Sequence, residues 1–499
     1  MRIAFYPIYT FFIFITFFRQ TNTCSAQGVL NNTRYQLETG TFLSTSGQTP
    51  FWLRSNQYGI VPLEAQFLTF RGAAHKEYDS TRSENQKLKR FGYGYGAWGA
   101  VNLGKVNQLL LPEAYIKVRY GAFEFYGGRR RELVGLVDTT LTSGSYIWSG
   151  NSLPMPKIQI SIPNYTSIIG HGLVSIKGAY AHGWFGSSDS TKNFFLHQKY
   201  LYGRIGKPNW KIKFYGGFNH QVQWGGRPTK PYIEKQTGKL ITSYGNDFNT
   251  YLNVITGVPL NRNGDGIDKD GIPINDALNR SGNHLGSVDI ATEINFNKFD
   301  LFIYRQSIYE DGSLFYLGNI TDGLFGFSIK RKKAKSGLLK FVFEYINTNN
   351  QGGLAGGEST IPQIRGVDNY FNNSLYTWIY RNNTVGTPLI MPLNSVQKSI
   401  FSDYTTLSKG ITQTYMVTNH VSGIFLAVNF MIKNRNFTSK LSQTNNLVYG
   451  VPKSISQFSI FQSVQFKYKQ YFVNSHVAYD ANALFKSNLG IGLNLKRQF

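Results

Sequence analysis

Aromatic rings and planar hydrogen-bonding groups crowd into one short stretch, residues 48–59, which reads QTPFWLRSNQYG. The candidate residues in it are Trp52, Arg54, Asn56, Gln57 and Tyr58. A sugar ring has an apolar C–H face and a rim of hydroxyl groups, which flat rings and guanidinium or amide groups complement. The stretch therefore predicts a carbohydrate-binding site. The alternative is a structural plug, which suits Phe51 and Trp52 equally well.

A run of arginines and a second aromatic loop extend this candidate site. Arg129 and Arg130 open the run RRRE at residues 129–132, and a guanidinium can form paired hydrogen bonds with a carboxylate or a phosphate. Trp148 lies in a loop over residues 143–156 that is rich in Gly, Ser, Pro and Asn. We expect these three residues to contribute to glycan binding. For the arginines, the alternative is a charged rim near lipid headgroups.

The sequence carries no catalytic fingerprint. His182 and His220 stand near tryptophans, yet neither an H-E-x-x-H run nor a G-x-S-x-G elbow accompanies them. The chain has only 27 acidic residues, and no spacing singles out a pair for glycoside hydrolysis. We therefore predict that the protein is not an enzyme, with no catalytic residue and no cofactor.

One segment has the opening of a calcium-binding loop. Asn261, Asn263 and Asp265 occupy positions 1, 3 and 5, and Gly266 occupies position 6. Position 12, where such loops carry a bidentate Glu, is Ile272. These residues are a weak calcium candidate, and a Gly/Asp-rich turn is the alternative interpretation.

The last stretch of the chain, Leu489 to Phe499, alternates strictly between apolar and other residues and ends on an aromatic residue. Period two is the pattern of a strand with two different faces. This ending resembles the C-terminal signature of bacterial outer-membrane proteins, whose last strand must pair with the first because an open edge is not tolerated in lipid. We expect Tyr35 to Leu43 to be that first strand. The alternative is an ordinary sheet strand that comes last.

Similar alternation recurs along the chain in about 18 or 19 segments, Thr412–Val421 among them. A single-chain bacterial barrel has an even number of strands, so the pattern predicts an all-β, transmembrane antiparallel β-barrel of about 18 strands with short internal helices or plug loops. The longest interruptions, at about 225–283 and 347–410, predict long loops. In residues 91–103, glycines share one strand face, which leaves room inside for a plug or a ligand.

Composition and the N-terminus agree with secretion to the envelope. After the N-terminus, the chain of 499 residues has no apolar run of the roughly 20 residues that a spanning helix needs. Residues 1–26 resemble a signal peptide, with Arg2, an apolar run and small residues before Gln27. The barrel would then be residues 27–499, and the only cysteine, Cys24, would leave with the signal. The alternative is an uncleaved anchor.

The formal net charge of +25 indicates acidic partners. A soluble domain this basic would suggest nucleic acid, but a secreted, aromatic-rich strand protein does not suit that partner. We expect surface polysaccharide, the phosphates of lipopolysaccharide and outer-membrane lipid instead, together with the barrel assembly machinery acting on the C-terminal strand. The alternative is that much of the positive charge simply faces solvent or lipid phosphate.

Four ordered segments resemble a known family: QTPFWLRSNQYG, FYGGRRRELVG, SGNSLPMPKIQISIPNY and LVSIKGAYAHGWF. They are similar to the Wzi-type capsule assembly family as it occurs in Bacteroidetes-like bacteria. The matching segments span residues 35–185. The rest of the chain agrees with the family in length and in the spacing of its expected strands. The resemblance implies a barrel of about 18 strands with internal helices, acting as a lectin that helps to retain or organise surface polysaccharide. The family's sugar contacts do not carry over, because no motif matches them.

Three hypotheses for function follow, all placed in the cell outer membrane. The first is a barrel lectin that assists assembly or retention of capsular polysaccharide. The alternative is a porin or transporter for a small, anionic solute, which the same barrel would serve. The third, a lipid or glycan hydrolase, lacks a nucleophile–base pair or a carboxylate pair in the sequence.

Overall fold

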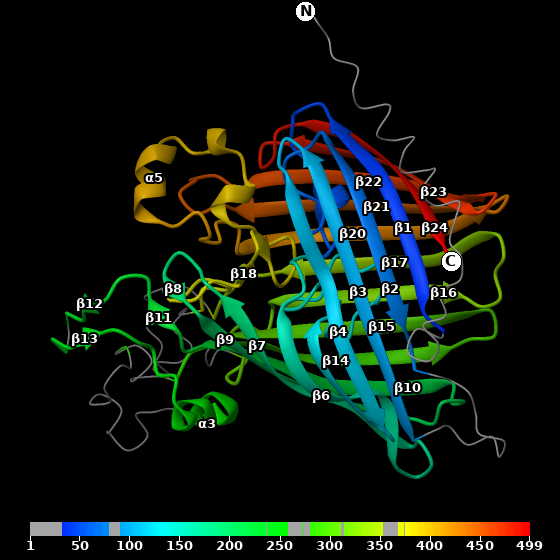
Figure 1. Ribbon diagram of the computed structural model, residues 1–499, viewed down its shortest axis with the longest axis horizontal. Coiled ribbons are helices and arrows are strands. Elements are labelled where there is room, and N and C mark those ends of the chain that lie inside the picture. Colours follow the sequence, from blue (N-terminus) through cyan, green and yellow to red (C-terminus); the bar gives the residue numbers. More distant parts are fainter. Residues whose placement is uncertain are drawn as a thin grey trace, which may run out of the picture.

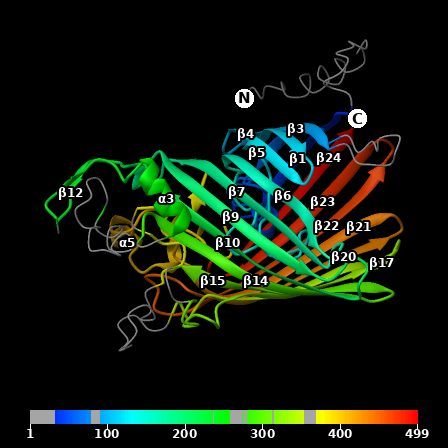
Figure 2. The same cartoon turned by 90° about the horizontal axis from the view of Figure 1, so that it is seen from below.

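The computed structural model describes residues 32–78, 90–235, 237–257, 273, 280–310, 314–352, 368–373 and 375–499. In these residues, 18 antiparallel strands form one closed sheet, in which each strand pairs with the next barrel strand and the last pairs with the first (Figures 1 and 2). The expected fold class is thereby confirmed. The signal peptide expected at residues 1–26 and the calcium candidate at Asn261, Asn263 and Asp265 lie outside the described residues.

The barrel strands, in chain order, are β1 (Arg34–Ser44), β2 (Phe67–Lys76), β3 (Phe91–Gly104), β4 (Gln108–Tyr120), β5 (Phe123–Arg129), β6 (Pro156–Ile169), β7 (Val174–Gly186), β9 (Phe194–Ile205), β10 (Ile212–Trp224), β14 (Asn283–Asn295), β15 (Phe299–Glu310), β16 (Gly323–Arg331), β17 (Gly337–Asn347), β20 (His420–Ile432), β21 (Arg435–Leu447), β22 (Ile455–Tyr468), β23 (Tyr471–Asn482) and β24 (Asn488–Gln498).

Smaller elements lie in the connections. The two-residue strands pair as β8 (Thr191–Lys192) with β11 (Arg227–Pro228), β12 (Tyr232–Ile233) with β13 (Leu240–Ile241), and β18 (Ile379–Tyr380) with β19 (Asn383–Thr384). The helices are α2 (Phe51–Arg54), α3 (Phe248–Thr256) and α5 (Tyr404–Gly410), with 3₁₀ turns η5 (Leu393–Ser395) and η6 (Lys398–Ile400). None of the helices in the described residues is long and apolar enough to span a membrane.

The barrel closes where the sequence predicts. Strand β24 pairs with β1, and the register places Leu493 opposite Thr41. At the end of the chain, Tyr35 and Phe499 exchange two backbone hydrogen bonds, of 3.3 and 3.0 Å between N and O. The pairing therefore extends to the last residue, which explains why the alternation continues to the end of the sequence.

The apolar face of the wall points outward. In β24, Leu489, Ile491 and Leu493 are 44–50% exposed, whereas Gly490 and Asn494, between and after them, are buried. A soluble sheet would bury such leucines, but lipid accepts them, and a closed barrel leaves no backbone group of its wall unpaired. The protein is therefore an integral protein of the outer membrane.

The two ends of the barrel differ. The start of β1 at Arg34, the C-terminal Phe499 and short turns such as Gly121–Ala122 lie at one end, which we call the short-turn end. The opposite, long-loop end carries the connections 225–282 and 348–419, and α5 and β12 project from it (Figure 1). In bacterial outer-membrane barrels the short turns face the periplasm and the long loops face outward, so the long-loop end is the cell-surface end.

Three connections from the long-loop end fold back into the barrel. We call them the plug: residues 45–66, 130–155 and the described part of 368–419. Their apolar side chains form one buried core with the inner wall, and its members from the plug include Phe51, Trp52, Ile60, Val134, Ile147, Leu153, Trp378, Ile390 and Met416. The expectation of short internal helices and plug loops is confirmed by α2 and these segments.

The prediction of a strand at Thr412–Val421 is wrong for most of that range. Residues 412–419 belong to the plug, and β20 begins at His420. Met416 and Val417 are fully buried, and Val417 N donates to Met391 O at 3.0 Å. Here the alternating side chains contact other parts of the plug and not a neighbouring wall strand. The barrel has 18 strands without this segment.

Candidate functional site

Buried carboxylates of the inner wall accept hydrogen bonds from the backbone of the plug. The four N–H to carboxylate pairs come from both sides of the barrel: Phe51 with Asp480 (2.8 Å), Leu136 with Asp289 (2.9 Å), Ser143 with Glu344 (2.7 Å) and Phe371 with Glu310 (3.1 Å). A buried carboxyl group is costly unless it is hydrogen-bonded, and the backbone N–H groups of the plug supply these bonds. The plug is therefore anchored to β14, β15, β17 and β23.

A salt bridge adds to this anchoring. Lys340 of β17 contacts Asp138 of the plug at 2.7 Å between Nζ and Oδ2. Burial alone would raise the pKa of the Asp138 carboxyl, but the hydrogen bond and charge of Lys340 outweigh burial and hold that pKa below its ordinary value. Asp138 is thus ionised and paired at neutral pH.

A cavity of about 390 Å³ lies between the plug and the wall, on the side of β2 and β4. Its size falls within the range of small-ligand pockets. It is lined by Tyr58, His75, Glu77, Glu113, Tyr115, Arg130 and Arg131. We call it the Arg130 cavity. A much smaller cavity beside it, of about 10 Å³, shares Tyr58 and Arg130 and is also lined by Glu132 and Trp148.

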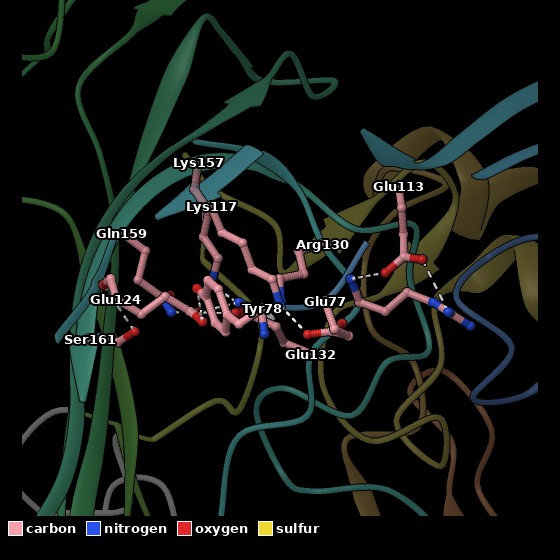
Figure 3. Close-up of polar contacts among 11 residues, drawn as sticks. Glu77, Tyr78, Glu113, Lys117, Glu124, Arg130, Glu132, Lys157, Gln159 and Ser161 are labelled. Atoms are coloured by element: carbon pink, nitrogen blue, oxygen red, sulfur yellow. Dashed lines mark hydrogen bonds and ion pairs between the residues drawn. The ribbon is translucent and has the colours of Figure 1, made fainter. Parts of the chain in front are cut away.

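Cations and carboxylates pair with one another at and next to the Arg130 cavity, and Figure 3 draws several of these contacts. Glu113 lies at the centre of one group, with Oε2 at 2.8 Å from His75 Nε2 and 3.0 Å from Arg131 Nη2. The further ion pairs are Arg130 with Glu124 (2.5 Å), Lys117 with Glu77 (2.5 Å) and Lys157 with Glu132 (2.6 Å). Since a guanidinium has five N–H donors, one such ion pair leaves donors for a ligand.

Aromatic rings hold the guanidinium groups in place. Arg131 lies 4.4 Å from the ring centroid of Trp98 and 5.6 Å from that of Tyr58, and Arg130 lies 5.5 Å from that of Tyr115. These are cation–π distances. Burial lowers the pKa of Arg130, but the charges of Glu124 and Glu132 outweigh it and raise that pKa above the ordinary value, so Arg130 carries a permanent charge.

Tyr58 is a neutral member of the cavity wall. Burial raises the pKa of its phenol, and the nearby charge of Arg131 only partly opposes this. Its backbone has a left-handed conformation (φ 53°), and its N–H donates to Gly150 O at 2.8 Å. A residue at 150 with a Cβ would press against the Tyr58 ring, so the glycine leaves room for that ring.

The structure brings three of the eight predicted glycan residues together. Tyr58 and Arg130 line the Arg130 cavity, and Trp148 joins them at the smaller cavity. Trp148 is buried, and the Lys157 ammonium lies 4.9 Å from its ring centroid. Two segments far apart in the sequence, around residues 58 and 130–148, therefore contribute to one site.

Trp52 and Arg54 lie elsewhere in the plug, against β21 to β23. Trp52 is 1% exposed, and its indole N–H donates to Ser442 Oγ at 2.9 Å. The Arg54 guanidinium lies 5.7 Å from the ring of Phe51 and 5.6 Å from that of Phe485. Burial lowers the pKa of Arg54, and the charge of Asp480 opposes this. These two residues pack the plug, as the structural interpretation of Trp52 expects.

The remaining three predicted residues connect parts of the plug. Asn56 N donates to Asn151 Oδ1 at 3.1 Å, and Asn56 Nδ2 donates to Ser143 O at 2.7 Å. The Gln57 carbonyl accepts from Ile60 N at 3.2 Å. Arg129, at the end of β5, donates from Nη2 to the Tyr380 hydroxyl at 3.1 Å. Asn56 thus joins two plug segments, and Arg129 joins the wall to a third.

Sequence reasoning missed most of the cavity lining that comes from the wall, including His75, Glu113 and Tyr115. The signal was present in residues 108–120, where Glu113, Tyr115 and Lys117 alternate with outward apolar residues. The glycines of β3 make room for these side chains of β4. A Cβ at Gly96, for example, would overlap the Tyr115 ring. The room that these glycines leave is filled by side chains of the neighbouring strand.

No metal centre adds to this site in the described part of the chain, where no group of three or more His, Cys, Asp or Glu side chains is arranged to hold a metal ion. The polar groups of the cavity are organised by one another instead, as the ion pairs around Glu113 and Arg130 illustrate.

Neither a protein-family model nor a curated protein matches the chain. Similar solved structures include OccK5 (OpdH) of Pseudomonas aeruginosa, with 9% identity, a TM-score of 0.44 and coverage of 95% of this chain and 99% of that chain. OccAB4 of Acinetobacter baumannii has 10% identity, a TM-score of 0.45 and coverage of 94% and 97%. A loop L8 deletion mutant of OmpT, an outer membrane protein of Vibrio cholerae, has 7% identity, a TM-score of 0.34 and coverage of 94% and 98%. Values this low carry no conclusion about function.

Proposed function

We propose that this protein is a plugged outer-membrane barrel that binds an acidic surface polysaccharide and assists its assembly or retention. The observation that carries the proposal is the anchored plug, which fills the lumen with a packed core and leaves the Arg130 cavity beside it. The resemblance of residues 35–185 to the Wzi-type capsule assembly family supports the same role. Binding, and not catalysis, is the proposed activity.

The chemistry of the cavity suits a charged sugar. Glu77 and Glu113 can accept hydrogen bonds from hydroxyl groups, whereas Arg130, Arg131 and Tyr58 can donate them. A guanidinium also pairs with the carboxylate of an acidic sugar. The net charge of +25 would steer an anionic polymer toward the protein from a distance.

Deleting the gene and measuring polysaccharide in two fractions tests this proposal. We expect less polysaccharide to stay with the cells and more to appear in the medium, with the total unchanged. Complementation with the wild-type gene should restore retention. Unchanged retention in the deletion strain would contradict the role in capsule assembly.

Transport of a small anionic solute is the second candidate. The observation that favours it is the concentration of ionisable side chains on the inner wall of β2, β4, β5 and β6, among them Lys117, Glu124 and Lys157, next to an open cavity. Such a wall would select anions or zwitterions. Uptake of a charged monosaccharide into cells or liposomes that depends on this protein would support transport over retention.

A further inference from the structure

Helix α3 packs on the outside of the barrel, near the long-loop end (Figure 2). Its Val254 forms a small buried cluster with Val222 and Trp224 of β10. These two positions face outward, because Gln223 between them points into the lumen and donates from Nε2 to the plug carbonyl of Thr377 at 2.7 Å. A helix thus covers part of the outer wall, where lipid would otherwise lie.

The ends of α3 are well defined. Asp247 caps the N-terminus, with its carboxylate accepting from Thr250 N at 2.9 Å and from Thr250 Oγ1 at 2.7 Å. Gly257, in the left-handed conformation (φ 65°), ends the helix and donates from N to Asn253 O at 2.8 Å. The helix itself, FNTYLNVIT, contains no charged residue.

The wall beneath α3 is rich in polar and ionisable side chains. His197 of β9 and His220 of β10 are buried in outward positions, and His220 Nε2 lies 3.0 Å from His284 Nδ1. Lys199 Nζ donates to the Ile255 carbonyl of α3, and the hydroxyls of Tyr180 and Tyr251 lie 2.9 Å apart. Acyl chains could not satisfy such groups, whereas α3 supplies polar partners to Lys199 and Tyr180 and places the Tyr251 ring against His197.

The opposite face of α3 is exposed, and it carries two large apolar side chains beside the polar Asn249 and Thr256. Phe248 is 71% exposed and Leu252 is 43% exposed, and a spacing of four residues places them on one side of the helix. Trp184 on the adjacent wall is also exposed. This face is therefore continuous with the lipid-facing surface of the barrel, at the height where aromatic girdles of such barrels meet the headgroups.

We propose that α3 is an interfacial helix that lies in the outer leaflet, with Phe248 and Leu252 inserted among the lipids, and that it shields the histidine-rich patch from acyl chains. A protein partner fits less well, because stable protein interfaces bury about 800 Å² on each side, which two large apolar side chains do not supply. An uncharged helix with an aromatic and an aliphatic anchor suits a lipid surface. The inference is independent of the ligand proposed for the Arg130 cavity.

Lipid quenching of a single label tests this placement. In the full chain with Cys24 replaced by serine, Phe248→Cys and, separately, Leu252→Cys carry an environment-sensitive fluorophore. The protein is reconstituted in phosphatidylcholine vesicles with and without nitroxide-labelled lipid. Leu493→Cys, on the lipid-facing side of β24, is the positive control, and Thr405→Cys, exposed on α5, is the control for a position outside the bilayer.

We expect labels at 248 and 252 to be quenched several-fold more than the label at 405, and to a degree comparable with the label at 493. A heat-induced shift in gel mobility checks that each variant is folded. Quenching at both positions no greater than at position 405, in folded protein, would overturn the proposal.

Discussion

At the residue scale, Glu113 and Arg130 organise the proposed binding site. Glu113 accepts from His75, from the Arg131 side chain and from Arg131 N at 3.2 Å. Arg130 pairs with Glu124 and packs against Tyr115 and Tyr126. Each group has several partners, so the cavity holds its donors and acceptors in place before a ligand arrives, which reduces the entropy cost of binding.

Replacing Arg130 should weaken binding of an acidic polysaccharide. A hydrogen bond to a charged group contributes about 1.5–3 kcal/mol, so we expect Arg130→Ala to lower affinity by roughly tenfold to a hundredfold, measured by calorimetry with purified protein. Arg129→Ala is the matched control, because Arg129 contacts Tyr380 outside the cavity. Equal affinities for the two variants would contradict the assignment of the cavity.

Trp52 should contribute to stability and not to binding. Trp52→Phe removes the hydrogen bond to Ser442 and leaves that buried hydroxyl without its indole donor, so we expect the plug to lose about 1 kcal/mol of stability. Thermal unfolding in detergent measures this loss. The affinity for polysaccharide should stay within about twofold of the wild type, since a tenfold change would need about 1.4 kcal/mol of binding free energy. A large loss of affinity would show that Trp52 belongs to the binding site.

At the element scale, the plug segments determine what the barrel can do. Residues 45–66 and 130–155 each connect two neighbouring wall strands, and the third segment leads into β20. Wall carboxylates accept hydrogen bonds from the backbone of all three. A loop that merely covered the entrance would keep its polar backbone in water. Here the backbone is buried and hydrogen-bonded, so the plug is part of the folded core.

The salt bridge between Asp138 and Lys340 should make the plug sensitive to acid. Because the pKa of Asp138 is lowered below its ordinary value of 3.8, the ionised carboxylate stabilises the folded state above that value, and this contribution is lost as the pH falls through the lower folded-state pKa. We expect Asp138→Asn to destabilise the plug at neutral pH and to lose part of the acid sensitivity. Thermal unfolding as a function of pH measures both effects.

Lys340→Met is the partner control for this prediction. It removes the other half of the same ion pair, so the double variant should lose no more pH dependence than either single variant. Additive losses in the double variant would show that Asp138 and Lys340 act separately.

The sequence predicted strands better than it predicted the plug. Period two identified β1 and β24 and their pairing, because an outward apolar face is a local property. The same signal misassigned Thr412–Val421, since alternation does not reveal whether the partner is a wall strand or another plug segment. For the site, residue type identified Tyr58, Arg130 and Trp148. Glu113 was missed because residue type does not reveal the pairing register of β4 with β5, which puts Ala114 opposite Arg129 and so brings Glu113 next to residues 130–131.

At the scale of the whole molecule, the pairing of Phe499 with Tyr35 completes the wall. Removing Phe499 deletes the last two backbone hydrogen bonds of that seam, and an open edge is poorly tolerated in lipid. We expect the truncated protein to accumulate less in the outer membrane, measured as the heat-modifiable folded band in membrane fractions. Phe499→Tyr should assemble normally, whereas normal insertion of the truncated chain would remove the proposed role of this residue.

At this scale, the anchored plug is the feature that would distinguish the proposed binding protein from an open channel. The side-chain core crosses the lumen, with members on β14 and β23 such as Leu285 and Ala478, and several wall carboxylates hold it there. A double variant, Asp289→Ala with Glu344→Ala, should release residues 136–143 from the wall. A barrel with a loosened plug should pass intermittent current. The double variant therefore serves as the control that the protein has inserted into the bilayer in an electrical measurement.

Conductance in planar lipid bilayers tests the central claim most directly. The purified wild-type protein should show no steady open-channel current, while the double variant, inserted under the same conditions, shows current bursts. A steady conductance of the wild-type protein would contradict the plugged barrel and would favour the transporter.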